Sequence, residues 1–248
     1  MLIKIYKPIG ISCGTLIKQL KESPEYKDKK MAFSGRLDEM AHGIVLVLVG
    51  DSTKLSPQYD AKQKTYRFRF VIGVETDTTS VLGIICDKSR VNSEVNPNEI
   101  TEYINSFDGK TFVQEYHIFS SFVPKHDKYK MPLWQWAIEN KLSELLETPK
   151  KEVTILNIKT LQYKKVSIGD FLEESFNNLN KLQGGEFRKD KIIEQWKKFK
   201  DVTPYKMMYE FECIATVSSG FYVRQFVKDL GKNFNINVTV TEIERTSI

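Results

Sequence analysis

Runs of apolar residues along the chain predict five strands. The run 44–50, IVLVLVG, is continuous, rich in β-branched residues and closed by a glycine, as expected for a strand buried on both faces. The segment 2–10 begins with a shorter apolar pattern that Pro8 and Gly10 end. The remaining predicted strands span 65–73, 153–163 and 211–219.

The predicted strand 65–73 has two chemically different faces. Tyr66 and Phe68 lie on one face with the later apolar residues, whereas Arg67 and Arg69 lie on the other. Such a strand usually packs one face on the core and turns the other toward solvent. Tyr66 is therefore either a core residue or, if a ligand site opens on that face, a binding residue.

Apolar residues spaced three and four apart predict helices. In 96–109, Asn96 can cap, Pro97 suits the first turn, and Ile100 and Ile104 belong to one apolar stripe. The stretch 221–231 has the same spacing and places Gly231 at its end. Further helices are predicted at 13–24 and 132–147.

Strands and helices are mixed without regular alternation, which favours an α+β fold with a mixed, mainly antiparallel sheet flanked by helices. The polar, charged segment from about 167 to 203 has a helical pattern and lies between two predicted strands. We therefore expect one domain, 1–248, with a helical insertion at 167–203.

Composition narrows the function classes. The 248 residues include 41% hydrophobic residues and carry a net charge of +5, enough for a sizeable core and compatible with a polyanionic partner. The three cysteines and three histidines form neither a disulfide framework nor a metal-ligand pattern. No signal peptide and no membrane-length apolar run is evident. We expect a soluble intracellular protein, in cytoplasm or nucleus, without a metal.

The segment SGRLDEMAHG, 34–43, places Arg36 and Asp38 immediately before the buried strand 44–50. A carboxylate at the end of a buried strand is costly without a partner or a function. The local pattern leaves two alternatives, a salt-bridged turn or an active site.

Five blocks, in order along nearly the whole chain, resemble the TruB family of tRNA pseudouridine synthases. SGRLDEMAHG with the strand after it is similar to that family's nucleophile motif, and VSSGFYVRQFVKDLG to its Ser-x-Gly-Thr-Tyr-Ile-Arg segment. The other blocks are YKPIGIS, KTYRFRFVIGVETDTTSVLG and FSSFVPKHDKYKMPLWQWA, and EIERT fits the end of the catalytic domain. The family resemblance implies the pseudouridine synthase fold with a catalytic cleft. The PUA domain that often follows in the family is not expected within these residues.

The resemblance implies roles for five residues. Asp38 matches the catalytic aspartate, which must be ionised beside the ribose and therefore needs a nearby cation. Arg224 matches the arginine that pairs with it, and Tyr66 the tyrosine that stacks on the target base. Tyr222 and Ile243 match pocket residues that bind substrate. Lys7 and Pro8 are expected to support the catalytic loop, or simply to end a strand.

Some positions depart from the family pattern. Phe33 stands where the family usually has an RNA-contacting histidine, and Glu39 follows the aspartate in place of proline. His42 replaces a small polar residue, and Arg36 resembles the Arg-Leu-Asp of other pseudouridine synthase families. Phe33 and Arg36 are expected to bind substrate.

The loop 119–136 resembles the family segment that covers the T loop of tRNA. Lys125, Lys128 and Lys130 alternate there with aromatic residues, an arrangement that suits phosphate and base contacts. Trp134 and Trp136 are either RNA contacts or core residues.

The implied activity is isomerisation of uridine to pseudouridine in RNA, in the T loop of the tRNA T-arm (tRNA position 55), by a monomer that needs no cofactor and no membrane. The alternative is an RNA-binding or RNA-chaperone protein of the same fold with weak or no catalysis, for which Phe33 and Glu39 are the motives. The retention of Asp38, Arg224 and Tyr66 together favours the enzyme.

Overall fold

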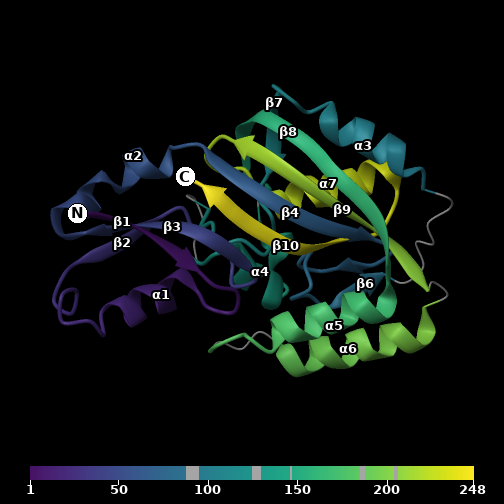
Figure 1. Ribbon diagram of the computed structural model, residues 1–248, viewed down its shortest axis with the longest axis horizontal. Coiled ribbons are helices and arrows are strands. Elements are labelled where there is room, and N and C mark those ends of the chain that lie inside the picture. The colour runs from purple at the N-terminus through teal and green to yellow at the C-terminus, as the bar shows by residue number, and fades with distance from the viewer. Residues whose placement is uncertain (88–94, 125–129, 146, 185–187, 204–205) are drawn as a thin grey trace.

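An eight-stranded sheet forms the centre of the molecule (Figure 1). The computed structural model describes residues 1–87, 95–124, 130–145, 147–184, 188–203 and 206–248. The strand order is β1-β3-β10-β4-β9-β8-β7, with β2 paired to β3. Strand β10 pairs with β3 in parallel. The strands are β1 Leu2–Lys7, β2 Met31–Ser34, β3 Ala41–Val49, β4 Lys64–Ile72, β7 Thr111–Glu115, β8 Lys150–Ser167, β9 Met207–Val217 and β10 Val238–Ser247, and a separate pair is β5 Glu75–Thr76 with β6 Ile85–Asp87.

Helices cover the sheet where its strands present apolar residues. The α-helices are α1 Cys13–Leu20, α2 Ser56–Asp60, α3 Pro97–Asn105, α4 Leu133–Ile138, α5 Ile168–Leu179, α6 Lys189–Val202 and α7 Val223–Phe234, and two 3-10 segments are η1 Gly50–Leu55 and η2 Leu142–Glu144. Buried residues of α1, α3 and α7 form the main core with one face of the sheet. The α+β prediction with a mainly antiparallel sheet is confirmed. In the described part of the chain, no helix has the length and apolarity that a membrane crossing requires.

The alternating strand β4 has the predicted apolar face. Phe68 and Phe70 are fully buried in the main core. The opposite face differs from the expectation of free solvent: the Arg69 side chain is 18% exposed because three carboxylates surround it. These belong to Glu242, Glu210 and Glu174 of α5. The polar face of the sheet is thus partly covered.

The segment between β8 and β9 forms the hairpin of α5 and α6, which lie side by side below the sheet in Figure 1. Ser167 caps α5 by accepting a hydrogen bond from Asp170 N at 3.0 Å. Trp196 of α6 is fully buried and donates from Nε1 to Val81 O at 3.1 Å. The hairpin therefore packs on the turn between β5 and β6, which also borders the candidate site.

Three helix predictions were wrong in extent. The helix predicted at 13–24 ends at Leu20. The helix predicted at 132–147 is interrupted after α4, because Asn140 has a left-handed φ of 54° and Lys141 N bonds back to Trp136 O at 2.9 Å. The helix predicted to end at Gly231 continues to Phe234, and Asn235 forms its left-handed end. Gly231 lies where the helix meets β10, since a Cβ there would contact Val238.

Candidate active site

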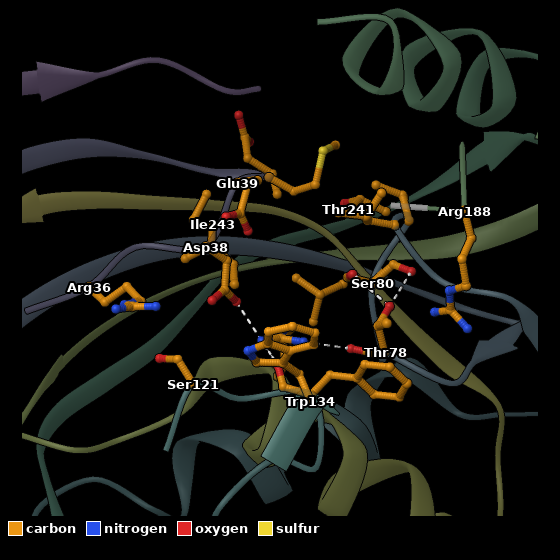
Figure 2. Close-up of a pocket in the computed structure, with 18 of the residues that line it drawn as sticks. Arg36, Asp38, Glu39, Thr78, Ser80, Ser121, Trp134, Arg188, Thr241 and Ile243 are labelled. Atoms are coloured by element: carbon orange, nitrogen blue, oxygen red, sulfur yellow. Dashed lines mark hydrogen bonds and ion pairs between the residues drawn. The ribbon is translucent and has the colours of Figure 1, made fainter. Parts of the chain in front are cut away.

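Asp38 and Arg224 lie far apart in the sequence and form an ion pair in the structure. Asp38 lies on the loop between β2 and β3, and Arg224 in the first turn of α7. Arg224 Nη2 is 2.6 Å from Asp38 Oδ2, and the arginine side chain is 8% exposed whereas the aspartate side chain is 43% exposed. Figure 2 shows the carboxylate pointing into a cavity. A buried cation therefore holds an accessible carboxylate. The 34–43 segment contains a salt-bridged residue, and the same residue lines a cavity.

Backbone carbonyls fix the Arg224 guanidinium. Nη1 donates to Thr78 O and Nη2 to Phe119 O, each at 3.1 Å. Burial, and next the Arg224 charge, lower the pKa of His117 well below its ordinary value, so this imidazole is neutral. His117 Nδ1 accepts from Phe119 N at 3.1 Å, so Nε2 carries the hydrogen and donates to Thr79 at 3.2 Å. A neutral histidine thus braces the turn that holds the arginine.

Lys7 and Gly10 contact the loop that contains Asp38. Lys7 is fully buried and its Nζ donates to Ile11 O at 2.8 Å and approaches Glu39 O at 3.5 Å. Burial lowers the pKa of Lys7 to about 8. Gly10 N also donates to Glu39 O, at 2.8 Å. The residue after Asp38 is therefore held through its backbone, which does not depend on a proline at that position.

Arg245 of β10 connects the two ends of the loop that contains Asp38. It is fully buried, and it donates from Nε to Ile44 O at 2.7 Å and from Nη2 to Gly35 O at 3.0 Å. Gly43 has a φ of 112°, and a Cβ there would overlap the backbone of Arg245. The final glycine of the 34–43 motif is thus required by the close approach of β10.

Two cavities meet at the ion pair. The first, about 490 Å³, is lined by three tyrosines and Ile243, and the second, about 390 Å³, by the turn after β5, Phe119 and Trp134. Asp38 and Arg224 line both. The tyrosines are Tyr66, Tyr116 and Tyr222.

The aromatic part of the first cavity is uncharged. Tyr66 is 9% exposed, and burial raises its pKa, while burial and the Asp38 charge raise the pKa of Tyr222 to about 12. Both phenols are therefore neutral near pH 7. Ile243 pairs with Ala41 in the parallel register of β10 and β3, which brings its side chain to the same cavity.

Six of the predicted site residues line these two cavities: Asp38, Arg36, Tyr66, Tyr222, Arg224 and Ile243. Phe33 does not line either cavity, but lies under the Arg36 guanidinium, 5.7 Å from ring centroid to Cζ. Lys130 is exposed and outside both linings, and Lys125 and Lys128 lie outside the described residues. Trp136 is buried at 2% and belongs to the core, whereas Trp134 is 41% exposed and lines the second cavity.

Sequence reasoning missed several residues of the site. Thr78 and Phe119 act through carbonyl oxygens, which any residue type supplies, so no side-chain signal could identify them. His117 lies directly before the predicted RNA-covering loop but matches no ligand pattern. Arg188 comes from the insertion, where no motif marks it, and lines the second cavity. Among the described residues, no group of three or more His, Cys, Asp or Glu side chains could hold a metal ion.

A family model described as TruB family pseudouridylate synthase (N terminal domain) matches residues 24–173, more than half of the chain. The chain belongs to the TruB family. The TruB match contains Asp38 and Tyr66, whereas Arg224, Tyr222 and Ile243 follow its end.

Curated relatives extend the TruB similarity over the whole chain. The tRNA pseudouridine synthase B of Fusobacterium nucleatum is 25% identical over 253 residues, which cover 100% of this chain and 67% of the relative. That of Aquifex aeolicus is 25% identical over 244 residues, covering 98% and 67%. In a solved Cbf5-Nop10-Gar1 complex, one chain superposes with a TM-score of 0.56 at 13% identity, covering 99% of this chain and 47% of that one. The structural likeness shows a shared fold.

Proposed function

We propose that this protein isomerises uridine to pseudouridine in RNA, with the T-loop uridine of the tRNA T-arm as its target and a single chain as the active unit. One observation carries the proposal: the Asp38–Arg224 ion pair, 2.6 Å long, opens onto a cavity lined by Tyr66, Tyr222 and Ile243. The names of the curated relatives support tRNA as the substrate class.

The proposed reaction needs the target base outside its stack, because the ribose C1′ and the base are otherwise covered. The uracil enters the first cavity between neutral aromatic and apolar walls. Asp38, ionised beside Arg224, either attacks C1′ or removes a proton from the sugar to give a glycal. The N1–C1′ bond breaks and the uracil turns. C5 then bonds to C1′, either as the Asp38 Oδ–C1′ bond breaks or as Asp38 returns its proton to C2′ of the glycal, and in both routes C5 loses its proton and N1 gains one. The isomerisation consumes no co-substrate.

A non-catalytic RNA-binding or RNA-chaperone protein is the competing function. Such a protein has no need for a carboxylate that is 43% exposed in a cavity and held by an arginine that is 8% exposed. An RNA-binding surface would gain more from an unpaired arginine, since a carboxylate beside a phosphate is repulsive. The ion pair therefore favours catalysis.

The test incubates the protein with unmodified tRNA transcript and maps pseudouridine by position. Asp38→Asn is the matched control, because the amide keeps the shape of the side chain but cannot act as a carboxylate. We expect pseudouridine in the T loop with the parent protein, none with the variant, and similar RNA affinity for both. Tight binding without pseudouridine in any transcript would instead contradict catalysis and favour the RNA-binding function.

A further inference from the structure

Arg188, at the start of the α5–α6 hairpin's second helix, reaches the cavity that contains the catalytic pair. It is the residue before α6 and lines the second cavity together with Asp38 and Arg224. In Figure 2, Arg188 and Arg36 lie at opposite ends of this cavity with Asp38 between them. Arg188 also lies in the 167–203 insertion, outside the blocks that carry the family resemblance, so the resemblance assigns it no role.

The guanidinium groups of Arg36 and Arg188 each lie against a phenyl ring. The Arg36 guanidinium lies 5.7 Å from the Phe33 ring, and the Arg188 guanidinium 5.4 Å from the Phe119 ring. Stacking on a phenyl ring fixes the guanidinium plane and leaves its edge N–H groups free to bind a phosphate. The cavity therefore carries a preoriented arginine on each side of Asp38.

Asp77 accepts a hydrogen bond from one of the guanidinium nitrogens of Arg188. Among the described residues, Nη1 donates to Asp77 Oδ2 at 2.7 Å, and the Arg188 side chain remains 31% exposed. Asp77 is also engaged by the turn itself, because its Oδ1 accepts from Ile84 N at 2.8 Å. The charge of this carboxylate is thus shared between a backbone donor and the arginine, which has five N–H donors in total.

We propose that Arg188 binds a backbone phosphate of the RNA next to the target uridine, on the side of the target away from Arg36. The inference rests on the proposed function, since it places the target ribose at Asp38. A polyanion that passes Asp38 meets repulsion there, and an arginine on each side compensates for it. The insertion then contributes directly to substrate positioning.

The competing role for Arg188 is a brace that only holds Asp77 and the turn after β5. Two substitutions separate the roles. Arg188→Ala removes both the phosphate contact and the brace, whereas Asp77→Asn removes the negative charge of the brace and keeps Arg188 available. Lys200→Ala is the control, since Lys200 is an exposed cation on the same helix.

Binding of unmodified tRNA transcript is measured over a range of salt concentrations, in the Asp38→Asn background so that no RNA is converted. We expect Arg188→Ala to weaken binding about tenfold and to reduce the slope of log affinity against log salt by about 0.7, one single-strand phosphate contact. Arg188→Lys should restore the slope but only part of the affinity. Asp77→Asn and Lys200→Ala should leave the affinity within about twofold.

The inference is overturned if Arg188→Ala keeps the parent salt slope, or if Asp77→Asn weakens binding as much as Arg188→Ala does. Thermal unfolding of each variant identifies any that fails to fold. If Arg188→Ala does not fold, the RNA affinities of Arg188→Lys and Asp77→Asn are compared, and the inference requires a lower affinity for Arg188→Lys only. Because the readout is binding, a parent protein that forms no pseudouridine would contradict the proposed function while leaving the Arg188 result interpretable.

Discussion

Asp38 and Arg224 differ widely in exposure although they form one ion pair. The arginine is enclosed by the carbonyl groups of Thr78 and Phe119, and the aspartate keeps an accessible side. A buried guanidinium with three oxygen partners is a rigid mount for one carboxylate orientation. We therefore expect Arg224 to orient the Asp38 carboxylate and not to bind the substrate.

Arg224→Ala should therefore lower kcat by about 100-fold or more, which corresponds to about 3 kcal/mol in the barrier. Arg224→Lys should recover only part, because an ammonium cannot bond to Asp38, Thr78 O and Phe119 O in the planar arrangement observed. Single-turnover kinetics on saturating RNA measure both variants. A fully active alanine variant would remove Arg224 from the site, and a fully active lysine variant would show that charge alone suffices.

At the residue scale, sequence reasoning located the side chains that a motif specifies and missed those that act through the backbone. Asp38, Tyr66, Tyr222, Arg224 and Ile243 line one cavity, and their roles in catalysis stay a prediction. Phe33, predicted to bind substrate, lies beneath Arg36 and packs against the main core, and neither cavity is lined by it. The supporting carbonyl groups could not be predicted, since their identity depends on turn geometry.

At the element scale, a single glycine connects the insertion to the catalytic loop. Gly10 has a φ of 97°, its N donates to Glu39 O, and its O accepts from Gln183 N at 2.8 Å. A Cβ at this position would overlap the carbonyl of Lys181 at the end of the hairpin's first helix. Gly10 thus forms backbone hydrogen bonds both to the insertion and to Glu39, the residue after Asp38.

Gly10→Ala should lower the free energy of unfolding by about 1–3 kcal/mol more than Gly50→Ala does. Gly50 is a matched control because it also has a positive φ, 66°, but has nothing within 4 Å of an added Cβ. Gly10→Ala should also reduce kcat, since Glu39 loses a fixed donor. Urea unfolding and turnover measure the two effects. Equal destabilisation by both substitutions would show that only backbone strain matters at Gly10.

Glu242 joins three strands and makes their association dependent on pH. It accepts from His42 of β3 and from Arg69 of β4, and these bonds lower its pKa to about 2. Because this pKa lies below that of the unfolded chain, the ionised form stabilises the fold. The contribution is complete above about pH 4.5 and is lost as the pH falls toward about 2.

Glu242→Gln should therefore be less stable than the parent by up to about 3 kcal/mol near pH 6, and the difference should shrink near pH 3. Chemical denaturation of both proteins at these two pH values measures it. Asp51→Asn is a control at an exposed carboxylate, whose side chain is 97% exposed. A difference between parent and Glu242→Gln that does not change with pH would assign the effect to packing.

Periodicity identified the long elements but not the short or interrupted ones. The predicted strands at 65–73, 153–163 and 211–219 correspond to β4, β8 and β9. The short strands β2 and β7 have few residues in which a pattern could appear, and they are stabilised by their partners in the sheet. The final strand β10 begins with the alternating residues VTVT but was not predicted. The left-handed residue Asn140, which ends α4, likewise cannot be read from apolar spacing.

At the scale of the whole molecule, the net charge of +5 attracts RNA without any specific contact. The effect of individual phosphate contacts on RNA binding must therefore be distinguished from the effect of the net charge. Replacing Lys125, Lys128 and Lys130 together by alanine should reduce the salt slope of RNA binding by about 2, with little effect on turnover at saturating RNA. Filter binding at several salt concentrations measures the slope.

The control for the lysine substitutions is a second triple variant with the same change in net charge, on the exposed side of α6. Lys191, Lys197 and Lys200 are exposed there. If both triple variants lower the salt slope equally, only the general field is involved and the loop 119–136 does not meet the RNA backbone.

The parallel pairing of β10 with β3 has a consequence for protein synthesis. β10 is inserted between β3 and β4, so these two strands each lack a neighbour until residues 238–247 have left the ribosome. A nascent chain without β10 exposes two unpaired strand edges and has neither Ile243 nor Arg245 to complete the catalytic loop. Ribosome-bound chains that stop before β10 should therefore depend on chaperones and lack activity, however much of the sheet they have already made.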